Sequence, residues 1–140
     1  APTGAAAEIV GYAASILVAD DIAENRELIV HMLTAAGMTV ETATDGAEAV
    51  AAVARQAFDL VLMDVQMPGM DGLMATRAIR DLGNRTPILA LTANTQQAQI
   101  QRCLEAGMDG HIAKPVNAKR LLTTLAPWLT PPSPELSKEA

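Results

Sequence analysis

The amino-acid sequence predicts an α/β fold in which helices cover both faces of a parallel β-sheet. Five short apolar runs alternate along the chain with five stretches of helical periodicity. The runs at 60–64 and 87–92 are apolar almost throughout, which is typical of central parallel strands that are buried on both faces. Strict alternation of strands and helices is typical of right-handed β–α–β units, so all five strands are expected to be parallel.

The first half of the chain contains two predicted strands and two predicted helices. Residues 15–20, SILVAD, form an apolar run and predict the first strand. A helix is predicted over 25–36, because an apolar stripe repeats at helical spacing through Leu28, Ile29, Met32, Leu33 and Ala36. Residues 39–43, TVETA, alternate and suit an edge strand, and residues 45–56 predict the second helix.

The second half of the chain repeats this alternation. Strands are predicted at 60–64, 87–92 and 110–113, and helices at 72–82, 96–106 and 117–129. Gly83 and Gly107 directly follow two of these helices, at a position where glycine commonly ends a helix. The folded domain is therefore predicted to cover 15–129.

The two ends of the chain differ in composition from this domain. Residues 1–14 lack the basic start and apolar stretch of a signal peptide, and are interpreted as a linker or a cloning remnant. Residues 130–140 are rich in Pro and Ser and predict a flexible tail. No apolar run is long enough to cross a bilayer, so we expect no membrane contact by this domain, although a parent chain could be membrane-anchored.

The composition also indicates which binding partners and which cellular compartment to expect. The formal net charge is −6 and aromatic residues make up only 2% of the chain, so direct binding of nucleic acid is not expected. Cys103 is the only cysteine, which excludes an internal disulfide and fits a reducing, cytoplasmic location.

Charged and polar residues stand at the carboxyl ends of four predicted strands. The first strand ends in Asp20 and Asp21, the third in Asp64 and the fourth in Thr92, and Lys114 follows the fifth. Ligands of open parallel sheets bind beyond this edge, so these side chains are expected to meet in one cleft. Singly, each residue has an ordinary structural explanation, such as a helix cap or a surface lysine.

Together, the three carboxylates would repel one another unless a cation neutralised them. Oxygen ligands favour Mg²⁺ or Ca²⁺ over Zn²⁺, and Mg²⁺ commonly binds one or two carboxylates, waters and a phosphate. A carboxylate can also act as the nucleophile in covalent phosphoryl transfer. The strand ends therefore predict a site for phosphoryl chemistry assisted by a divalent metal ion.

Four blocks of sequence resemble the receiver domains of two-component response regulators. They are LVADD at 17–21, DLVLMDVQMPGMDG at 59–72, PILALTA at 87–93 and GMDGHIAKPV at 107–116. The resemblance covers nearly all of 16–129 and is strongest to receivers of hybrid sensor histidine kinases. It implies a flavodoxin-like (βα)5 fold with strand order 2-1-3-4-5, and transfer of a phosphoryl group from a phosphohistidine to an aspartate.

The resemblance also implies the roles of the acidic residues. Asp64 matches the phosphoacceptor, Asp21 the direct metal ligand, and Asp20 the partner that acts largely through water. The backbone carbonyl of Gln66 would be a further ligand. The implied cofactor is Mg²⁺, with Mn²⁺ as a possible substitute.

Other positions match the phosphate-binding and switch residues of the family. Lys114 would pair with the phosphate, Pro115 would follow a cis peptide bond, and Thr92 would be the hydroxyl that moves to the phosphate. Ala93 would stay small to leave room. His111 stands where the family usually has Tyr or Phe; an exposed polar residue at a strand end explains it equally well.

Hydrolysis and partner docking involve a further set of residues. The side chains of Gln66 and Asn94 are expected to tune dephosphorylation. A small apolar patch beside the first helix is expected to dock a histidine kinase dimerisation domain or a histidine phosphotransfer domain; it consists of Ile22, Ala23, Pro115 and Val116.

Two alternatives belong to other functional classes. One is a pseudo-receiver that only binds protein, and the intact set of strand-end residues argues against it. The other is an acid-nucleophile phosphatase, but Gln66 stands where such enzymes carry an acidic residue. A receiver assists its own phosphorylation and dephosphorylation without being a turnover enzyme alone, whereas the parent chain could be a histidine kinase.

Overall fold

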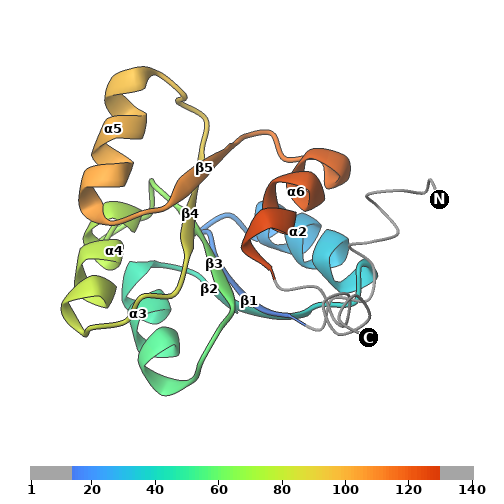
Figure 1. Ribbon diagram of the computed structural model, residues 1–140, viewed down its shortest axis with the longest axis horizontal. Helices are drawn as coiled ribbons and strands as arrows, with labels where there is room; N and C mark the ends of the chain where they lie inside the picture. The colour runs from blue at the N-terminus through green and yellow to red at the C-terminus, as the bar shows by residue number, and fades with distance from the viewer. Residues whose placement is uncertain (1–13, 130–140) are drawn as a thin grey trace, which may run out of the picture.

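A five-stranded parallel sheet forms the centre of the computed structural model, which describes residues 14–129 (Figure 1). The strand order is β2-β1-β3-β4-β5, as predicted. The strands are β1 (Ser15–Ala19), β2 (Thr39–Ala43), β3 (Leu60–Asp64), β4 (Ile88–Thr92) and β5 (Gly110–Ala113). The alternating segment β2 lies at an edge, whereas the continuously apolar β3 and β4 lie inside the sheet and are buried along their whole length.

Helices cover both faces of the sheet (Figure 1). They are α2 (Ala23–Ala35), α3 (Gly46–Arg55), α4 (Gly72–Asp81), α5 (Gln97–Ala106) and α6 (Ala118–Leu125), followed by the 3₁₀ turn η1 (Ala126–Trp128). The helices α2 and α6 lie on one face, and α3, α4 and α5 on the other. No helix within residues 14–129 is both long enough and apolar enough to span a bilayer.

Alternate strand residues supply two separate apolar cores. Ile16 and Val18 of β1 point toward α2 and α6, whereas Leu17 points to the opposite core. Successive side chains of a strand point to opposite faces, so a strand covered on both faces must be apolar at every position. This requirement explains the continuous apolar runs that identified β1, β3 and β4 in the sequence.

Two details differ from the sequence-based expectation. The apolar spacing predicts the last helix over 117–129, but α6 ends at Leu125 and Pro127 lies in the 3₁₀ turn η1. Proline lacks an amide N–H and clashes with the carbonyl four residues earlier, so it opposes continuation of the helix. Leu28, part of the apolar stripe predicted for the first helix, is 47% exposed, while Ile29 and Leu33 are buried.

The predicted linker at 1–14 and the predicted tail at 130–140 lie outside the described residues, apart from Ala14. Ala14 is buried, and its carbonyl accepts a hydrogen bond of 2.9 Å from the amide of Thr39. Ala14 therefore packs against the domain, although it falls in the linker predicted from the sequence.

Candidate functional site

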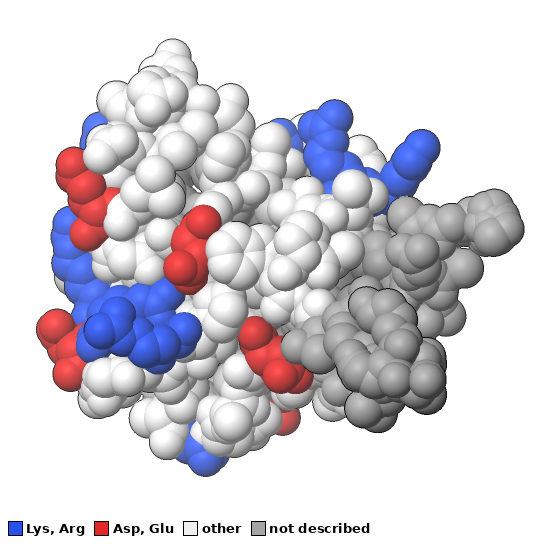
Figure 2. All heavy atoms as spheres, in the orientation of Figure 1, with Lys and Arg blue, Asp and Glu red and all other residues white. Residues whose placement is uncertain are grey.

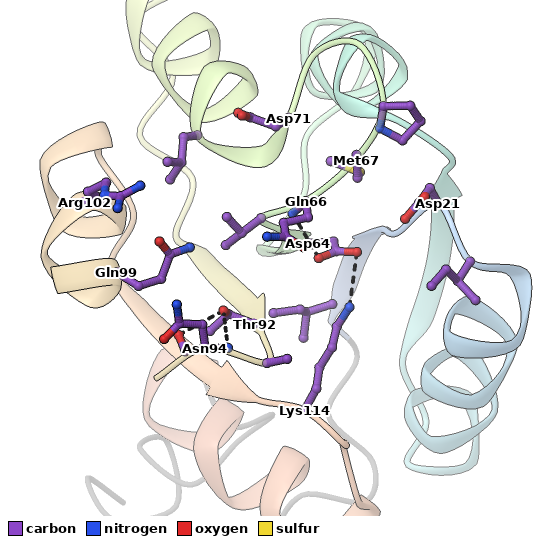
Figure 3. Close-up of a pocket in the computed structure, with 16 residues that line it drawn as sticks. Asp21, Asp64, Gln66, Met67, Asp71, Thr92, Asn94, Gln99, Arg102 and Lys114 are labelled. Carbon is purple, nitrogen blue, oxygen red and sulfur yellow. Dashed lines mark hydrogen bonds and ion pairs between the residues drawn. The ribbon is translucent and has the colours of Figure 1, made fainter. Parts of the chain in front are cut away.

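The carboxyl edge of the sheet holds a cleft of about 650 Å³ (Figure 3). Asp21 borders it from the turn between β1 and α2, Asp64 from the end of β3, Thr92 from the end of β4, and Lys114 from beyond β5. Asp20 is fully buried beside this group. The structure thus brings together residues that are distant in the sequence, because parallel strands all end at the same edge.

The three carboxylates of Asp20, Asp21 and Asp64 form a compact acidic cluster. Each offers one oxygen, and these oxygens all lie within 4.8 Å of one another. Asp20 and Asp64 are buried, whereas Asp21 is exposed to the cleft. Such close carboxylates repel one another unless cations compensate their charge.

Lys114 is one compensating cation. Its Nζ lies 3.2 Å from Oδ2 of Asp64 and 3.4 Å from Oδ2 of Asp20. Its amide N–H donates to the carbonyl of Thr92 at 2.9 Å, which fixes its main chain against β4, and the Lys114–Pro115 peptide bond is cis. A single ammonium group leaves this cluster with a net negative charge.

The two carboxylate oxygens of Asp20 differ in their partners. Oδ1 accepts a hydrogen bond of 2.9 Å from the amide of Ile22. Oδ2 is the one buried side-chain polar atom in residues 14–129 without a hydrogen bond, since Lys114 approaches it without hydrogen-bond geometry. Buried charged oxygens normally have a partner, so this oxygen is suited to a cation or to a water bound to one.

Asp64 is buried and lies close to one positive side chain, Lys114, and one negative side chain, Asp20. Its Oδ1 accepts a hydrogen bond of 3.2 Å from the amide of Gln66. Burial raises the pKa of Asp64 above its ordinary value; Lys114 opposes this effect and the negative charge of Asp20 adds to it. A cation bound in the cleft would favour the ionised carboxylate, which is the nucleophilic form.

The donor set fits a hard divalent cation. Carboxylate oxygens of Asp20, Asp21 and Asp64 are available, and Gln66, whose main-chain carbonyl is the further ligand expected from the resemblance, lines the same cleft. Oxygen-only ligands favour Mg²⁺, Mn²⁺ or Ca²⁺, and an open cleft leaves space for waters and a phosphate.

Thr92 and its neighbours form the wall of the cleft nearest α5. The Thr92 hydroxyl donates to the carbonyl of Asn94 at 3.1 Å and accepts from the Asn94 amide at 3.0 Å, so it is held within its own turn. Ala93 and Asn94 are exposed and border the cleft.

His111 is placed apart from this cleft. It lies on β5, half-buried, beside Ala90 of β4 in the strand register. It is absent from the residues that line the cleft.

The residues predicted to dock a partner lie on the α2 side of the cleft. Ile22 is 48% exposed, Ala23 and Pro115 are exposed, and Val116 is half-buried. A groove of about 70 Å³ between α2 and 114–116 is lined by Pro115, Val116 and the exposed Leu28, whereas Ile22 and Ala23 lie outside its lining.

Sequence reasoning missed Leu28 as a surface residue, and also missed the contributions of α5. Gln99 and Arg102 border the cleft opposite Asp21 (Figure 3). No strand-end rule identifies them, because they lie on helical turns. Leu28 was missed for another reason. It precedes Ile29 in an apolar stripe, and only the packing of α2 against the sheet decides which of the two side chains is buried.

Comparisons with known proteins agree with this geometry. Residues 16–126 match the response regulator receiver domain family. The chain is 45% identical over 111 residues to the sensor histidine kinase RcsC of Salmonella typhi, an alignment that covers 79% of this chain and 12% of RcsC. The chain thus corresponds to about an eighth of that relative.

Two solved structures are also similar. The receiver domain of the sensor histidine kinase PA1611 of Pseudomonas aeruginosa, which has magnesium in its active-site cleft, shows 41% identity and a TM-score of 0.77, with 83% of this chain and 97% of that chain covered. A co-crystal structure of the Saccharomyces cerevisiae phosphotransfer protein Ypd1 with the Ssk1 receiver domain shows 26% identity and a TM-score of 0.80, with 83% and 88% covered. Together with the family match, these similarities show that the chain belongs to the response regulator receiver domains of two-component signal transduction.

Proposed function

We propose that Asp64 accepts a phosphoryl group from a phosphohistidine of a partner protein, with the help of Mg²⁺. The observation that carries this proposal is the position of the buried Asp64 carboxylate, which has two further carboxylates within 4.8 Å and the Lys114 ammonium at 3.2 Å. It supports nucleophilic chemistry at Asp64, because the carboxylate opens to a cleft that can admit a phosphoryl group.

The transfer exchanges one bond to phosphorus for another. A carboxylate oxygen of Asp64 bonds to phosphorus while the bond from phosphorus to the histidine ring nitrogen breaks, and that nitrogen keeps the electron pair. Asp20, Asp21, Asp64 and the Gln66 carbonyl would hold the metal. Bound Mg²⁺ would neutralise charge on the carboxylates and on the phosphoryl oxygens; Mn²⁺, with the same ligand preference, is proposed as a substitute.

The remaining cleft residues would respond to the new negative charge. Lys114 pairs with the phosphoryl oxygens. Thr92 exchanges its hydrogen bonds within the Asn94 turn for one to the phosphoryl group, and Ala93 leaves space for that movement. The half-buried His111 on the adjacent strand would transmit the change toward the surface.

The lifetime of the phosphorylated form would depend on how water reaches it. Gln66 and Asn94 are both exposed and line the same cleft as Asp64 (Figure 3). Their side-chain amides can orient or block an attacking water, so substitutions at these two positions would change the rate of hydrolysis.

The partner would dock on the surface made by Ile22, Ala23, Pro115 and Val116; we include Leu28 in this surface, because it is exposed and lines a groove with Pro115 and Val116. The relationship of Ypd1 to the Ssk1 receiver supports a histidine phosphotransfer domain, and the RcsC similarity supports a histidine kinase dimerisation domain. We propose that the domain acts in the cytoplasm, as part of a hybrid histidine kinase. On the face drawn in Figure 2, basic groups gather at the left and at the upper right, with acidic groups and a broad uncharged surface between these two places.

Transfer of radiolabelled phosphate from a phosphorylated histidine phosphotransfer domain tests this proposal. Wild-type protein should become labelled in Mg²⁺ and lose the label in alkali, as an acyl phosphate does. Asp64→Asn should not be labelled, whereas Asp81→Asn, an exposed aspartate at the end of α4, should be labelled normally. Equal labelling of Asp64→Asn and wild type would refute the assignment of Asp64, and absence of labelling in both would favour a pseudo-receiver.

A further inference from the structure

Arg26, in the first turns of α2, reaches back to the acidic turn that precedes the helix. Its Nη1 donates a hydrogen bond of 2.8 Å to the backbone carbonyl of Asp20. The strand β1 ends at Ala19, so this carbonyl lies beyond the strand pairing and has no strand partner. A charge-assisted bond is stronger than an ordinary amide bond, which makes Arg26 a firm anchor.

The main chain of Asp20 is therefore held on both sides. Its amide donates to the carbonyl of Ala43 at 3.1 Å, and its carbonyl accepts from Arg26. The helix supplies no other side-chain anchor, because Ile22 is the residue at its N-cap and makes no side-chain capping bond. Without Arg26, the turn that presents Asp20 and Asp21 would keep the bond from the Asp20 amide to Ala43 and the bond from the Ile22 amide to Asp20 Oδ1, but the Asp20 carbonyl would lose its side-chain anchor.

We infer that Arg26 is a positioning residue for the acidic turn, which keeps the carboxylates of Asp20 and Asp21 arranged for a divalent cation. This inference rests on the proposed function, since it assigns a role toward the same metal. Arg26 contributes no ligand atom; its effect passes through the backbone of Asp20.

The charge of Arg26 makes the inference sharply testable. A cation beside a cation site repels the incoming ion, so if Arg26 acted only through its charge, its removal would tighten Mg²⁺ binding. The positive charge of Arg26 also acts on a neighbouring carboxylate. The pKa of Glu48 is lowered mainly by hydrogen bonds from Thr44, and the charge of Arg26 adds to this effect. If Arg26 acts by positioning, its removal weakens Mg²⁺ binding despite the lost repulsion. The two effects have opposite signs.

The experiment is a titration of Arg26→Gln with MgCl₂ at constant ionic strength, followed through the backbone amide signals of Ile22 and Gln66. We expect the dissociation constant to rise about fivefold, the scale on which one hydrogen bond acts. Arg55→Gln is the matched control, because Arg55 is exposed and makes only a 3.7 Å ion pair with Glu41; its dissociation constant should equal that of wild type. Arg26→Lys, which keeps the charge, should bind Mg²⁺ with intermediate affinity.

A second measurement on the same variants needs no metal. Hydrogen exchange of the Ile22 amide should be faster in Arg26→Gln than in Arg55→Gln, because the turn that accepts its bond is looser. Unchanged or tighter Mg²⁺ binding in folded Arg26→Gln, or unchanged exchange at Ile22, would overturn the inference. If Arg26→Gln does not fold, the comparison of Arg26→Lys with wild type decides, and equal affinity overturns it. Failure of wild-type protein to bind Mg²⁺ would instead refute the proposed metal site.

Discussion

The Nζ atom of Lys114 lies 3.2 Å from Oδ2 of Asp64, although β4 lies between β3, which ends at Asp64, and β5, which Lys114 follows. The same nitrogen is 3.4 Å from Oδ2 of Asp20. One ammonium group therefore compensates two buried carboxylates at once, and the stability of the metal-free domain depends on it.

Lys114→Ala should destabilise the metal-free domain strongly. The substitution leaves the buried carboxylates of Asp20 and Asp64 facing each other without a cation, and loss of one partner from a buried ion pair costs about 3 kcal/mol. Urea unfolding followed by circular dichroism measures this change in the free energy of unfolding. Added Mg²⁺ should recover part of the loss, because it supplies positive charge to the same cluster.

The control for this prediction is Lys119→Ala, at an exposed position on α6. It should change the free energy of unfolding by less than about 0.5 kcal/mol. Equal stabilities of the two variants would show that Lys114 does not compensate the buried charges.

Asp64→Asn should stabilise the metal-free domain at neutral pH, although it abolishes the proposed activity. The pKa of Asp64 is raised mainly by burial, so the folded chain binds the proton more tightly than the unfolded chain, and ionisation of Asp64 costs stability as the pH rises. We expect a gain of about 1 kcal/mol, the ordinary scale of one substitution.

The pH dependence of this gain has a defined sign. It should be largest above the raised pKa, should shrink as the pH falls through that pKa, and should vanish well below roughly 3.9, the value in the unfolded chain, because Asp64 is then protonated in both states. Saturating Mg²⁺ should stabilise wild type more than Asp64→Asn. Parallel stability curves for the two proteins from neutral to acid pH would contradict the assigned cause.

Gly72→Ala should destabilise the domain and weaken Mg²⁺ binding. A Cβ atom at Gly72 would clash with the backbone carbonyl oxygen of Asp64, so the strand end that carries Asp64 would have to move. Alanine normally stabilises a helix relative to glycine by about 1 kcal/mol, whereas here we expect a loss of about 2 kcal/mol.

Gly83→Ala is the control for Gly72→Ala, because it adds backbone strain without moving the residues of the cleft. Gly83 has a φ of +83°, and no atom outside Gly83 and its two chain neighbours lies within 4 Å of the position that a Cβ atom would take there. Alanine at this position therefore costs only conformational strain of about 1 kcal/mol. Urea unfolding and Mg²⁺ titration of both variants should show reduced stability in each, but reduced affinity only in Gly72→Ala.

Arg80→Lys should lower the free energy of unfolding by weakening contacts between the end of α4 and the loops that precede β4 and β5. The Arg80 guanidinium donates to the carbonyls of Gly107, Asn84 and Thr86, at 3.0, 3.0 and 2.8 Å, and also pairs with Asp109 at 3.0 Å. An ammonium group cannot reproduce this planar set of donors, so we expect a loss of about 2 kcal/mol in urea unfolding.

The exposed Arg77 on the same helix provides the comparison. Arg77→Lys should leave the free energy of unfolding within about 0.5 kcal/mol of wild type. Mg²⁺ affinity should be unchanged in both arginine variants, because neither residue borders the cleft. A weaker Mg²⁺ affinity in Arg80→Lys would show that this network extends to the acidic cluster.

The positions of the site residues followed from the sequence because they depend on one rule of topology. Apolar runs identified the strands, alternation with helices made them parallel, and parallel strands end at a common edge. Asp20, Asp64 and Lys114 could therefore be assigned to one cleft before any distance was known. The end of α6 was also within reach of sequence reasoning, since Pro127 marks it, but the apolar spacing continues past that proline to Leu129 and favours a longer helix.

The sequence by itself determined the order of elements, the edge of the sheet at which the acidic residues gather, and the oxygen-rich chemistry of that edge. Only the tertiary structure decided that Lys114 forms ion pairs with two carboxylates, that Asp20 Oδ2 has no hydrogen bond, and that Arg26 donates a hydrogen bond to the Asp20 backbone carbonyl. The physical reason is that periodicity depends on neighbours along the chain, whereas these contacts depend on how separate elements pack and on which side-chain rotamers that packing allows.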